Sequence, residues 1–475
     1  MSGTRAQLLT RPVVVFAGLV AVLRLPSFLG QLFDPDEAAL SAQAIGLWRG
    51  GEMYVDAIDR KPPFAQFVYE WSHRLTGNTD LRPLHALAAV LLVAATVMVA
   101  REACRVGGAR AMWWGGILVL TGALAMVPVD AQAANYSHLA MPFGAIAVVA
   151  ARRGTDRAAF VAGLALSIAT LTRQTWAIGV IPAAFALWHY GDWRRHLPLA
   201  FVGGLIPVGV VALMVPWDDF VYWSLESNGS FVLEGAEPAM ILGRGLFSIA
   251  VFTAFHLVAV WFAGRGSWRR HLDLWLWVGT GLVAVAAGYR FYGHYWMQVI
   301  PALSLLAAVE LGARSPGVQR RAGYLVAVSA AVAFVLAWMP SMVRELPDPD
   351  PLADFVVAQS GETDTVLVWG NFPEVHWKAE RAPAAGFVSM DFVTGRSGAR
   401  NSGPDTIPDA PDRGYPHLLA SIEAQAPAVI IDTQPSGFRE YGDYPISLFP
   451  ELERFVVANY RGPMIVDGFA VYVLR

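Results

Sequence analysis

The chain has 475 residues, of which 55% are hydrophobic and only 15% charged, with a net charge of −3 and a mean hydropathy of +0.43. A soluble domain carries about 25% charged residues, so this composition excludes an ordinary soluble enzyme, a disordered chain and a nucleic-acid-binding protein, which needs a basic excess. The one cysteine, Cys104, excludes an intramolecular disulfide and a cysteine-built zinc or iron–sulfur site. The composition therefore indicates a membrane protein.

Apolar stretches long enough to cross a bilayer recur through the first 340 residues. A membrane-spanning helix needs about 20 predominantly apolar residues. The stretches predicted as membrane helices are 12–30, 83–100, 111–128, 136–151, 158–172, 174–190, 197–216, 245–264, 274–289, 295–312 and 322–340. The sequence therefore predicts an α-helical polytopic protein with about 11 transmembrane helices. Alternatively, 158–190 forms one long helix with a re-entrant piece.

Arginine marks alternate loops between these segments. One set of loops carries most of the arginines, among them Arg101 and Arg152, whereas the other set carries mostly acids. Because Lys and Arg are concentrated in cytoplasmic loops, this asymmetry predicts a cytoplasmic N-terminus. Two outer regions are large, the first loop at about 31–82 and the tail. We therefore expect a transmembrane module over 1–344 and an extracytoplasmic α/β domain over 345–475.

The tail has the pattern of a compact α/β domain. Short runs rich in β-branched and aromatic residues predict strands, and one amphipathic run between two of them predicts a helix. The predicted strands are Thr365–Trp369, Ala428–Ile431, Phe455–Ala458 and Phe469–Leu474, and the predicted helix is His417–Ala426. A small soluble domain is therefore expected to follow the last membrane segment.

The first outer loop carries the most specific motif. It begins with Asp34-Pro35-Asp36-Glu37 and an amphipathic run to Trp48, and continues through Tyr54-Val55-Asp56 to Asp59-Arg60-Lys61-Pro62-Pro63. Asp34 fits an N-cap, Pro35 the first helical position and Glu37 the capping-box partner. Asp36 has no place in that scheme. A carboxylate at this position, at the outer edge of the membrane, can instead act as a general base.

Lysine is almost absent from the chain. Of the 35 Lys and Arg residues, only Lys61 and Lys378 are lysine. A lysine that persists where the chain otherwise uses arginine indicates a position that needs a compact ammonium. The Pro62-Pro63 pair after Lys61 would fix the backbone that aims its side chain. Lys61 can alternatively be a solvated loop residue, and Lys378 is expected to be one.

Two further motifs lie farther along the chain. They are Tyr289–Trp296 followed by Ile300–Leu303, and Val368–Glu374 at the start of the tail. Together with Asp36-Glu37 and Lys61-Pro62-Pro63, the set resembles the GT-C superfamily of integral-membrane glycosyltransferases. It is most similar to the bacterial family of protein O-mannosyltransferases and lipid A aminoarabinose transferases (glycosyltransferase family 39/83-like). The resemblance extends from about residue 12 to residue 390.

The sequence departs from that family at two places. Ala39-Leu40 stands where the lipid A branch has an Arg-Tyr pair, which speaks against an aminoarabinose donor and a lipid A acceptor. Asn135-Tyr136-Ser137-His138 stands where many relatives have an Asn-x-Glu element, so the contacts to the acceptor are expected to differ.

The resemblance implies inverting transfer of a sugar from a polyprenyl-phosphate carrier to an acceptor hydroxyl at the outer face of a bacterial plasma membrane. Asp36 would be the catalytic base. The residues that would neutralise the leaving phosphate are Lys61, Arg173, Arg290 and His294. The supporting or acceptor-side candidates are Asp34, Glu37, Asp56, Asn135 and Tyr292.

Several basic candidates also have a purely structural interpretation. Arg173 can snorkel to the membrane interface. Arg290 and His294 can belong to an interfacial aromatic belt that includes Tyr292. Arg24, inside the first helix, is costly unless it is paired, and we expect an ion pair with the first outer loop.

No metal site is predicted, because the sequence shows no His/Cys cluster. A divalent ion between Asp34 and Asp36 is a less favoured alternative, so a lipid-linked sugar donor is the expected small molecule and no cofactor is required. The expected partners are the bilayer, the polyprenyl-phosphate sugar and an envelope glycan, lipid or protein acceptor, and no nucleic acid. The alternative functions are a transporter or flippase, which should show duplicated halves and broken helices, a glycan ligase or polymerase on the same architecture, and an inactive scaffold.

Overall fold

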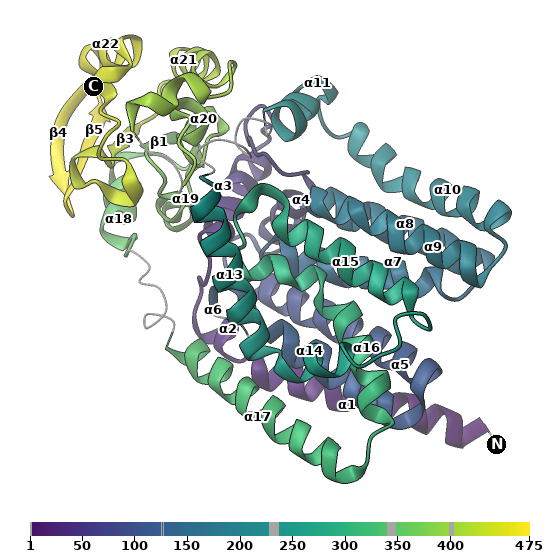
Figure 1. Cartoon of the computed structure of the whole chain (residues 1–475). Helices are drawn as coiled ribbons and strands as arrows, with labels where there is room; N and C mark the ends of the chain where they lie inside the picture. The colour runs from purple at the N-terminus through teal and green to yellow at the C-terminus, as the bar shows by residue number, and fades with distance from the viewer. Residues whose placement is uncertain (1, 125, 127, 228–236, 340–347, 399–402) are drawn as a thin grey trace. The chain divides into compact units, whose positions relative to one another are not determined.

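The structure is a computed structural model that describes residues 2–124, 126, 128–227, 237–339, 348–398 and 403–475 (Figure 1). The chain forms two compact units. Unit 1 comprises Met1–Asp34, Leu81–Val211 and Pro238–Glu345, and unit 2 comprises Pro35–Asp80, Ala212–Glu237 and Leu346–Arg475. Each unit is described by itself below.

Unit 1 is helical. Its helices are α1 (Ser2–Leu23), α2 (Pro26–Leu29), α5 (Arg82–Leu124), α6 (Pro128–Ala131), α7 (Tyr136–Ala151), α8 (Asp156–Thr172), η1 (Gln174–Gly179), α9 (Val180–Tyr190), α10 (Trp193–Ala212), α13 (Pro238–Phe255), α14 (Leu257–Ala263), α15 (Leu272–Ala286), η3 (Ala287–Tyr289), η4 (Gly293–Gln298), α16 (Ile300–Gly312) and α17 (Pro316–Trp338). Helix α5 packs on α16, and α7 lies beside α8 and α9 (Figure 1).

Several of these helices are long and apolar enough to cross a membrane. Among the described residues there are five, Arg82–Leu124, Trp193–Met214, Pro238–Phe255, Leu272–Tyr289 and Pro316–Trp338, and three shorter apolar helices accompany them. The exposed side chains of α10, α13 and α17 include many large apolar residues, such as Phe201, Phe247 and Val328. A multi-pass membrane protein presents such faces to lipid, and the predicted polytopic architecture is confirmed.

The predicted membrane segments overlap these helices, although several bounds differ. The segments 83–100 and 111–128 are two helices within the element α5, separated at Gly108, where the backbone is not helical (φ +83°). The segment 245–264 is divided between α13 and α14, and 295–312 begins with the 3₁₀ turn η4. The region 158–190 is two helices, since Arg173 is extended between α8 and the 3₁₀ turn η1 that precedes α9. Segment 136–151 coincides with α7. The break at Arg173 places that residue at a helix end.

Unit 2 contains a five-stranded sheet and the helices around it. Its elements are α3 (Pro35–Trp48), α4 (Phe64–Thr76), α11 (Trp217–Val221), η2 (Tyr222–Glu226), α18 (Asp350–Gln359), β1 (Thr365–Trp369), α19 (Pro373–Ala379), β2 (Ala382–Pro383), η6 (Ala384–Gly386), α20 (Asp391–Thr394), η7 (Pro404–Asp409), α21 (Gly414–Ala424), β3 (Val429–Asp432), η8 (Gln434–Ser436), η9 (Phe438–Glu440), η10 (Ile446–Leu448), α22 (Pro450–Asn459), β4 (Tyr460–Val466) and β5 (Phe469–Leu474).

The sheet is mixed, with strand order β2-β1-β3-β5-β4. Strand β1 pairs in parallel with β2 and β3, whereas β5 pairs antiparallel with β3 and β4. Val366, Val368 and Ile431 bury one face of the sheet against Leu352 of α18 and Val375 of α19. Consecutive residues of β1 and β3 are buried, so the centre of the sheet is covered on both faces. The predicted α/β region is thereby confirmed.

One predicted strand is wrong. Phe455–Ala458 lies in helix α22, which begins at Pro450, a residue that favours the first turn of a helix. The buried residues of α22 are Leu452 and Val456, four apart, which is the spacing of one helical face. The fourth long strand is instead β4, which directly follows this helix and pairs with β5.

Candidate active site

A continuous series of polar and aromatic contacts runs through unit 1 and joins residues far apart in the sequence. It connects residues of the α6–α7 connection, the end of α8 and the η4 segment. Five of the sequence candidates belong to it, and these are Asp34, Asn135, Arg173, Tyr292 and His294. Polar groups buried in a membrane helix bundle are costly and mark functional positions.

The first part of this series is the pair Asp130–His294. The backbone N–H of His294 donates to Asp130 Oδ1 at 2.9 Å, and His294 Nδ1 donates to the same oxygen at 3.1 Å. A carboxylate that binds Nδ1–H fixes the tautomer and turns Nε2 away from itself. Residue 293 is glycine, and a Cβ there would lie 2.1 Å from Asp130 Oδ2, so the carboxylate can approach only because no side chain is present.

Arg173 forms the second part. Its Nη1 donates to Ser137 Oγ at 2.6 Å, and its guanidinium lies 3.8 Å from the centre of the Tyr295 ring. The side chain is 5% exposed, so the snorkelling interpretation does not describe it. A buried arginine held by a hydroxyl and an aromatic face is a fixed cation. The Tyr295 ring also contacts His294, at 5.0 Å between ring centres.

Asn135 forms the third part. Its Nδ2 donates to Asp34 Oδ2 at 3.1 Å, and its Oδ1 accepts the backbone N–H of Ser137 at 3.0 Å and that of His138 at 3.4 Å. Asn135 is thus the N-cap of α7 and ties the start of this helix to Asp34. All three side chains, Asp34, Asn135 and His138, are buried. Asp34 is therefore part of a buried hydrogen-bond network as well as the residue before α3.

Arg24 stabilises this network through hydrogen bonds to the backbone. Its guanidinium donates to the backbone carbonyls of Ala131 (3.1 Å), Gln132 (2.8 Å) and Ala133 (3.1 Å). These carbonyls belong to the last residue of α6 and to the connection between α6 and α7. The expected ion pair between Arg24 and the first outer loop stays a prediction. Since Asp130 precedes them and Asn135 follows them, the three hydrogen bonds hold the segment that carries both residues.

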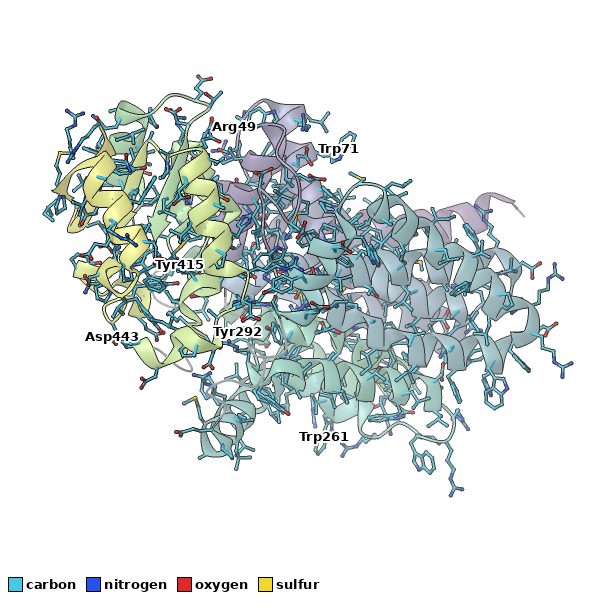
Figure 2. The ribbon with its side chains drawn as sticks, turned by 90° about the horizontal axis from the view of Figure 1, so that it is seen from above. Arg49, Trp71, Trp261, Tyr292, Tyr415 and Asp443 are labelled. Atoms are coloured by element: carbon cyan, nitrogen blue, oxygen red, sulfur yellow. The ribbon has the colours of Figure 1, made fainter. Side chains whose placement is uncertain are left out.

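Arg290 and Tyr292 flank the η4 segment. Arg290 is buried, with 8% of its surface exposed, directly after η3. Tyr292 is 45% exposed at the surface of unit 1 (Figure 2), and its ring stacks on that of His294 at 5.8 Å. The aromatic-belt interpretation therefore fits Tyr292. Arg290 and His294 are instead largely enclosed by the protein.

Asp36 and Glu37 lie in unit 2, in the first turn of α3, which begins at Pro35 as the sequence predicts. Glu37 is fully buried, whereas Asp36 is partly exposed. Asp36 is thus the more accessible of the two carboxylates. Negative charge in the first turn is favourable because the helix dipole is positive there.

The backbone of Lys61 is held at both of its polar groups. Its N–H donates to Asp59 Oδ1 at 3.0 Å, and its carbonyl accepts the hydroxyl of Tyr54 at 3.0 Å. Asp59 also accepts hydrogen bonds from the amides of Gln43 (3.2 Å) and Gln66 (2.9 Å). The position of Lys61 thus depends on Asp59 and Tyr54 as well as on the proline pair. Asp59 and Tyr54 were not among the site residues predicted from the sequence.

Two other candidates occupy plainer surroundings. Asp56 Oδ2 accepts the backbone N–H of Glu52 at 2.8 Å, which closes a local turn. Lys378 forms an ion pair with Asp350 at 3.0 Å, and about a third of its side chain is exposed. Lys378 is thus a surface residue in an ion pair. Among the described residues, no group of three or more His, Cys, Asp or Glu side chains could hold a metal ion.

Solved structures with a similar fold cover nearly the whole chain. ArnT from Cupriavidus metallidurans in the apo state matches with a TM-score of 0.63 and 15% identity, over 98% of this chain and 98% of that one. ArnT from the same organism bound to undecaprenyl phosphate matches equally well, over 97% of both chains. The chain has the fold of these ArnT structures. The fold expected from the motifs is thus confirmed.

A more distant structure has the same fold. The archaeal oligosaccharyltransferase AglB from Archaeoglobus fulgidus, in complex with an inhibitory peptide and a dolichol-phosphate, matches with a TM-score of 0.56 and 13% identity, over 98% of this chain and 74% of that one. No family model and no curated protein matches the sequence.

Proposed function

We propose that this protein is a membrane glycosyltransferase that transfers a sugar from a polyprenyl-phosphate donor to an acceptor of the cell envelope. The observation that carries the proposal is the GT-C fold over 98% of the chain, shared with a protein whose structure contains undecaprenyl phosphate. The buried polar series in unit 1 supports it, because an apolar helix bundle keeps such groups for a polar ligand. The arginine asymmetry of the loops favours a reaction on the extracytoplasmic side.

The donor phosphate is the group that needs cations. In the proposed reaction the bond between the anomeric carbon and the phosphate oxygen breaks, and the phosphate leaves with the electron pair. Cations held in a fixed place stabilise that developing charge without reorganising. In unit 1 the Arg173 guanidinium is fixed in this way by Ser137, and the His294 ring is held by Asp130. Arg290, four positions before His294 in the sequence, is also buried. We assign these three residues and Lys61 to the donor phosphate.

The acceptor hydroxyl needs a base. As its oxygen bonds to the anomeric carbon from the face opposite the phosphate, its proton passes to Asp36, and the sugar is transferred with inversion. Asp36 is favoured over Glu37 because Glu37 is fully buried. Asp34, Glu37, Asp56, Asn135 and Tyr292 are assigned supporting or acceptor-side roles. Neither a metal nor another cofactor enters this scheme, and the plasma membrane is its location.

The two lysines provide a test of the donor assignment. A lysine ammonium approaches one phosphate oxygen as a compact charge, whereas guanidinium is a wide planar fork. Lys61→Arg keeps the charge and should lower the transfer rate from a polyprenyl-phosphate sugar, measured in nanodiscs against donor concentration. Lys378→Arg is the matched control, and its ion pair with Asp350 can persist, so it should have the rate of the parent.

Two results contradict the proposal at different levels. If Lys61→Arg transfers sugar as well as the parent, the position needs only a positive charge and the lysine-specific role is wrong. If the parent neither binds undecaprenyl phosphate nor transfers sugar from any polyprenyl-phosphate donor, the proposed function is wrong. Mass spectrometry of envelope glycans from a deletion strain identifies the product.

A further inference from the structure

Unit 2 contains a cavity of about 340 Å³ whose residues take no part in the scheme above. Its walls come from three separate segments, with Tyr54 from the first outer loop, Asp219 and Trp223 from α11 and η2, and Asp412, Arg413 and His417 from the start of α21. Small-molecule sites have volumes of roughly 300–1,000 Å³. The cavity thus has room for a ligand the size of one sugar ring.

One wall of the cavity is aromatic and fixed. Trp223 is 2% exposed, and its ring is contacted nearly at right angles by Phe387 (5.9 Å), Phe392 (5.6 Å) and His417 (6.2 Å). Such edge-to-face contacts hold an aromatic ring in one orientation. Because Trp223 is almost wholly enclosed, it fixes this side of the cavity, and the accessible side chains here are Pro416 and His417. A pyranose has one face of C–H groups, which can lie on these rings without leaving a hydroxyl unpaired.

The rim of the cavity is polar and carries more acid than base. Asp219 forms an ion pair with Arg413 at 3.3 Å, and the Arg413 guanidinium lies 4.1 Å from the centre of the Tyr222 ring. Asp412 is exposed beside them. Carboxylates accept and guanidinium donates hydrogen bonds, so the rim can pair with the hydroxyls of a neutral sugar. Two carboxylates against one guanidinium disfavour a phosphate or another anion.

The floor of the cavity is joined to Lys61. The hydroxyl of Tyr54 accepts a hydrogen bond from Ser224 Oγ at 3.2 Å and donates to the Lys61 carbonyl at 3.0 Å. Burial raises the pKa of Tyr54 well above its usual 10, so the phenol keeps the proton that it donates. The Tyr54 backbone has a φ of +71°, a strained conformation for this residue. Such strain is often found at functional sites.

We propose that this cavity binds one neutral sugar residue of the acceptor. The proposal rests on the proposed glycosyltransferase function and specifies its acceptor as a neutral glycan or glycoconjugate. Pro416 and His417 contact the C–H face of the ring, and the rim of Asp219, Asp412 and Arg413 takes its hydroxyls. The hydrogen bond from Tyr54 to Lys61 connects the occupied cavity to a residue assigned to the donor phosphate.

The test uses the full chain in nanodiscs and two ligands. Methyl α-pyranosides of mannose, glucose and galactose are titrated by saturation-transfer NMR, with glucose 6-phosphate as the anionic comparison, and undecaprenyl phosphate binding is measured separately. The neutral glycosides should bind more tightly than the phosphate. Asp219→Asn and Asp412→Asn should each weaken glycoside binding by about tenfold, the effect of one charge-assisted hydrogen bond, and Val55→Trp should abolish it by filling the cavity.

The control is Asp218→Asn, which changes an exposed carboxylate next to Asp219 that does not line the cavity. It should bind the glycosides as the parent does. Undecaprenyl phosphate binding should be the same in every variant, which also shows that each is folded. The proposal is overturned if no neutral glycoside binds, if the rim variants bind like Asp218→Asn, or if glucose 6-phosphate binds better. Loss of undecaprenyl phosphate binding in the parent would instead reject the proposed function.

Discussion

Replacing Arg24, which follows helix α1, should destabilise unit 1 far more than replacing an exposed arginine of that helix. Arg24→Met keeps a long flexible side chain but removes all three hydrogen bonds to the carbonyls of Ala131, Gln132 and Ala133. A hydrogen bond from a charged donor contributes about 1.5–3 kcal/mol. Three such hydrogen bonds would together contribute roughly 4–9 kcal/mol to the stability of unit 1.

Two effects reduce this figure. Removing a buried guanidinium also removes its desolvation cost, which is several kcal/mol for an ion in a protein interior. The Gln132 carbonyl additionally keeps the hydrogen bond from Ser27 Oγ at 3.0 Å. The expected net loss is therefore about 2–4 kcal/mol. For a unit of this size it corresponds to a fall in Tm of roughly 4–16 °C.

The assay is thermal unfolding of the full chain in nanodiscs, with undecaprenyl phosphate binding measured below the transition. Arg24→Lys should lie between the parent and Arg24→Met, because one ammonium cannot reach three carbonyls as a planar fork does. Arg11→Met, at an exposed position on α1, is the control and should change the Tm by less than about 1 °C, as surface substitutions do.

Arg24→Met should also weaken lipid binding, because the three carbonyls lie between Asp130 and Asn135 in the chain. With the 131–133 segment released, Asp130 and Asn135 lose their fixed positions, and undecaprenyl phosphate binding should weaken in Arg24→Met even at temperatures where the chain is folded. If Arg24→Met has the Tm and the lipid affinity of the parent, the three hydrogen bonds do not hold the segment and the reasoning is refuted.

Three further predictions concern unit 2 and the orientation of the chain. Asp36→Asn should lower turnover by about 100-fold or more, the effect of losing a general base, with little change in Tm; turnover near that of the parent would exclude Asp36 as the base. Asp34→Ala also removes the hydrogen bond from Asn135, so it should lower stability by more than the cost of a lost N-cap, about 1 kcal/mol, and lower turnover less than Asp36→Asn does. Burial raises the pKa of Asp432 from 3.8 to about 6, so stability falls as pH rises from 3.8 to about 6, where the carboxyl ionises in the unfolded chain but not in the folded one, and the loss is complete above about 6. Asp432→Asn should therefore stabilise the chain by about 2–3 kcal/mol at pH 8 and not at pH 4, as measured by chemical unfolding, and an equal effect at both pH values would contradict this. A cysteine introduced at Gly51 should react with an impermeant thiol reagent on intact cells while native Cys104 does not, and labelling of Cys104 would reverse the orientation.

The helices of the membrane unit could be predicted closely because their signal is local. A run of apolar residues of the right length is sufficient, and α7 has the bounds expected from the sequence. The strands β1 and β5 also have the expected bounds, since their β-branched runs are short and unambiguous. Strand β4 was missed because Gly462 and Pro463 interrupt it and most of its residues are exposed, so no alternating pattern marks it.

The pairings within the candidate site could not be predicted from the sequence. His294 was a candidate and Asp130 was not, 164 positions separate them, and their pairing depends on how α6 packs near η4. The backbone acceptors of Arg24 were not predicted for the same reason. Buried arginine requires acceptors, and backbone carbonyls satisfy that requirement as well as carboxylates do, which a sequence pattern cannot distinguish.

The missing side chain at position 293 has a consequence for comparing sequences. A Cβ there would coincide with the Asp130 carboxylate, so any larger residue forces the carboxylate away and breaks the pair with His294. Gly293 and Asp130 should therefore be kept or lost together as homologues diverge. A homologue with another residue at the position of Gly293 must orient its histidine by a different acceptor. The presence or absence of this pair of residues can therefore group distant proteins of the same fold when their overall sequence identity is too low for that purpose.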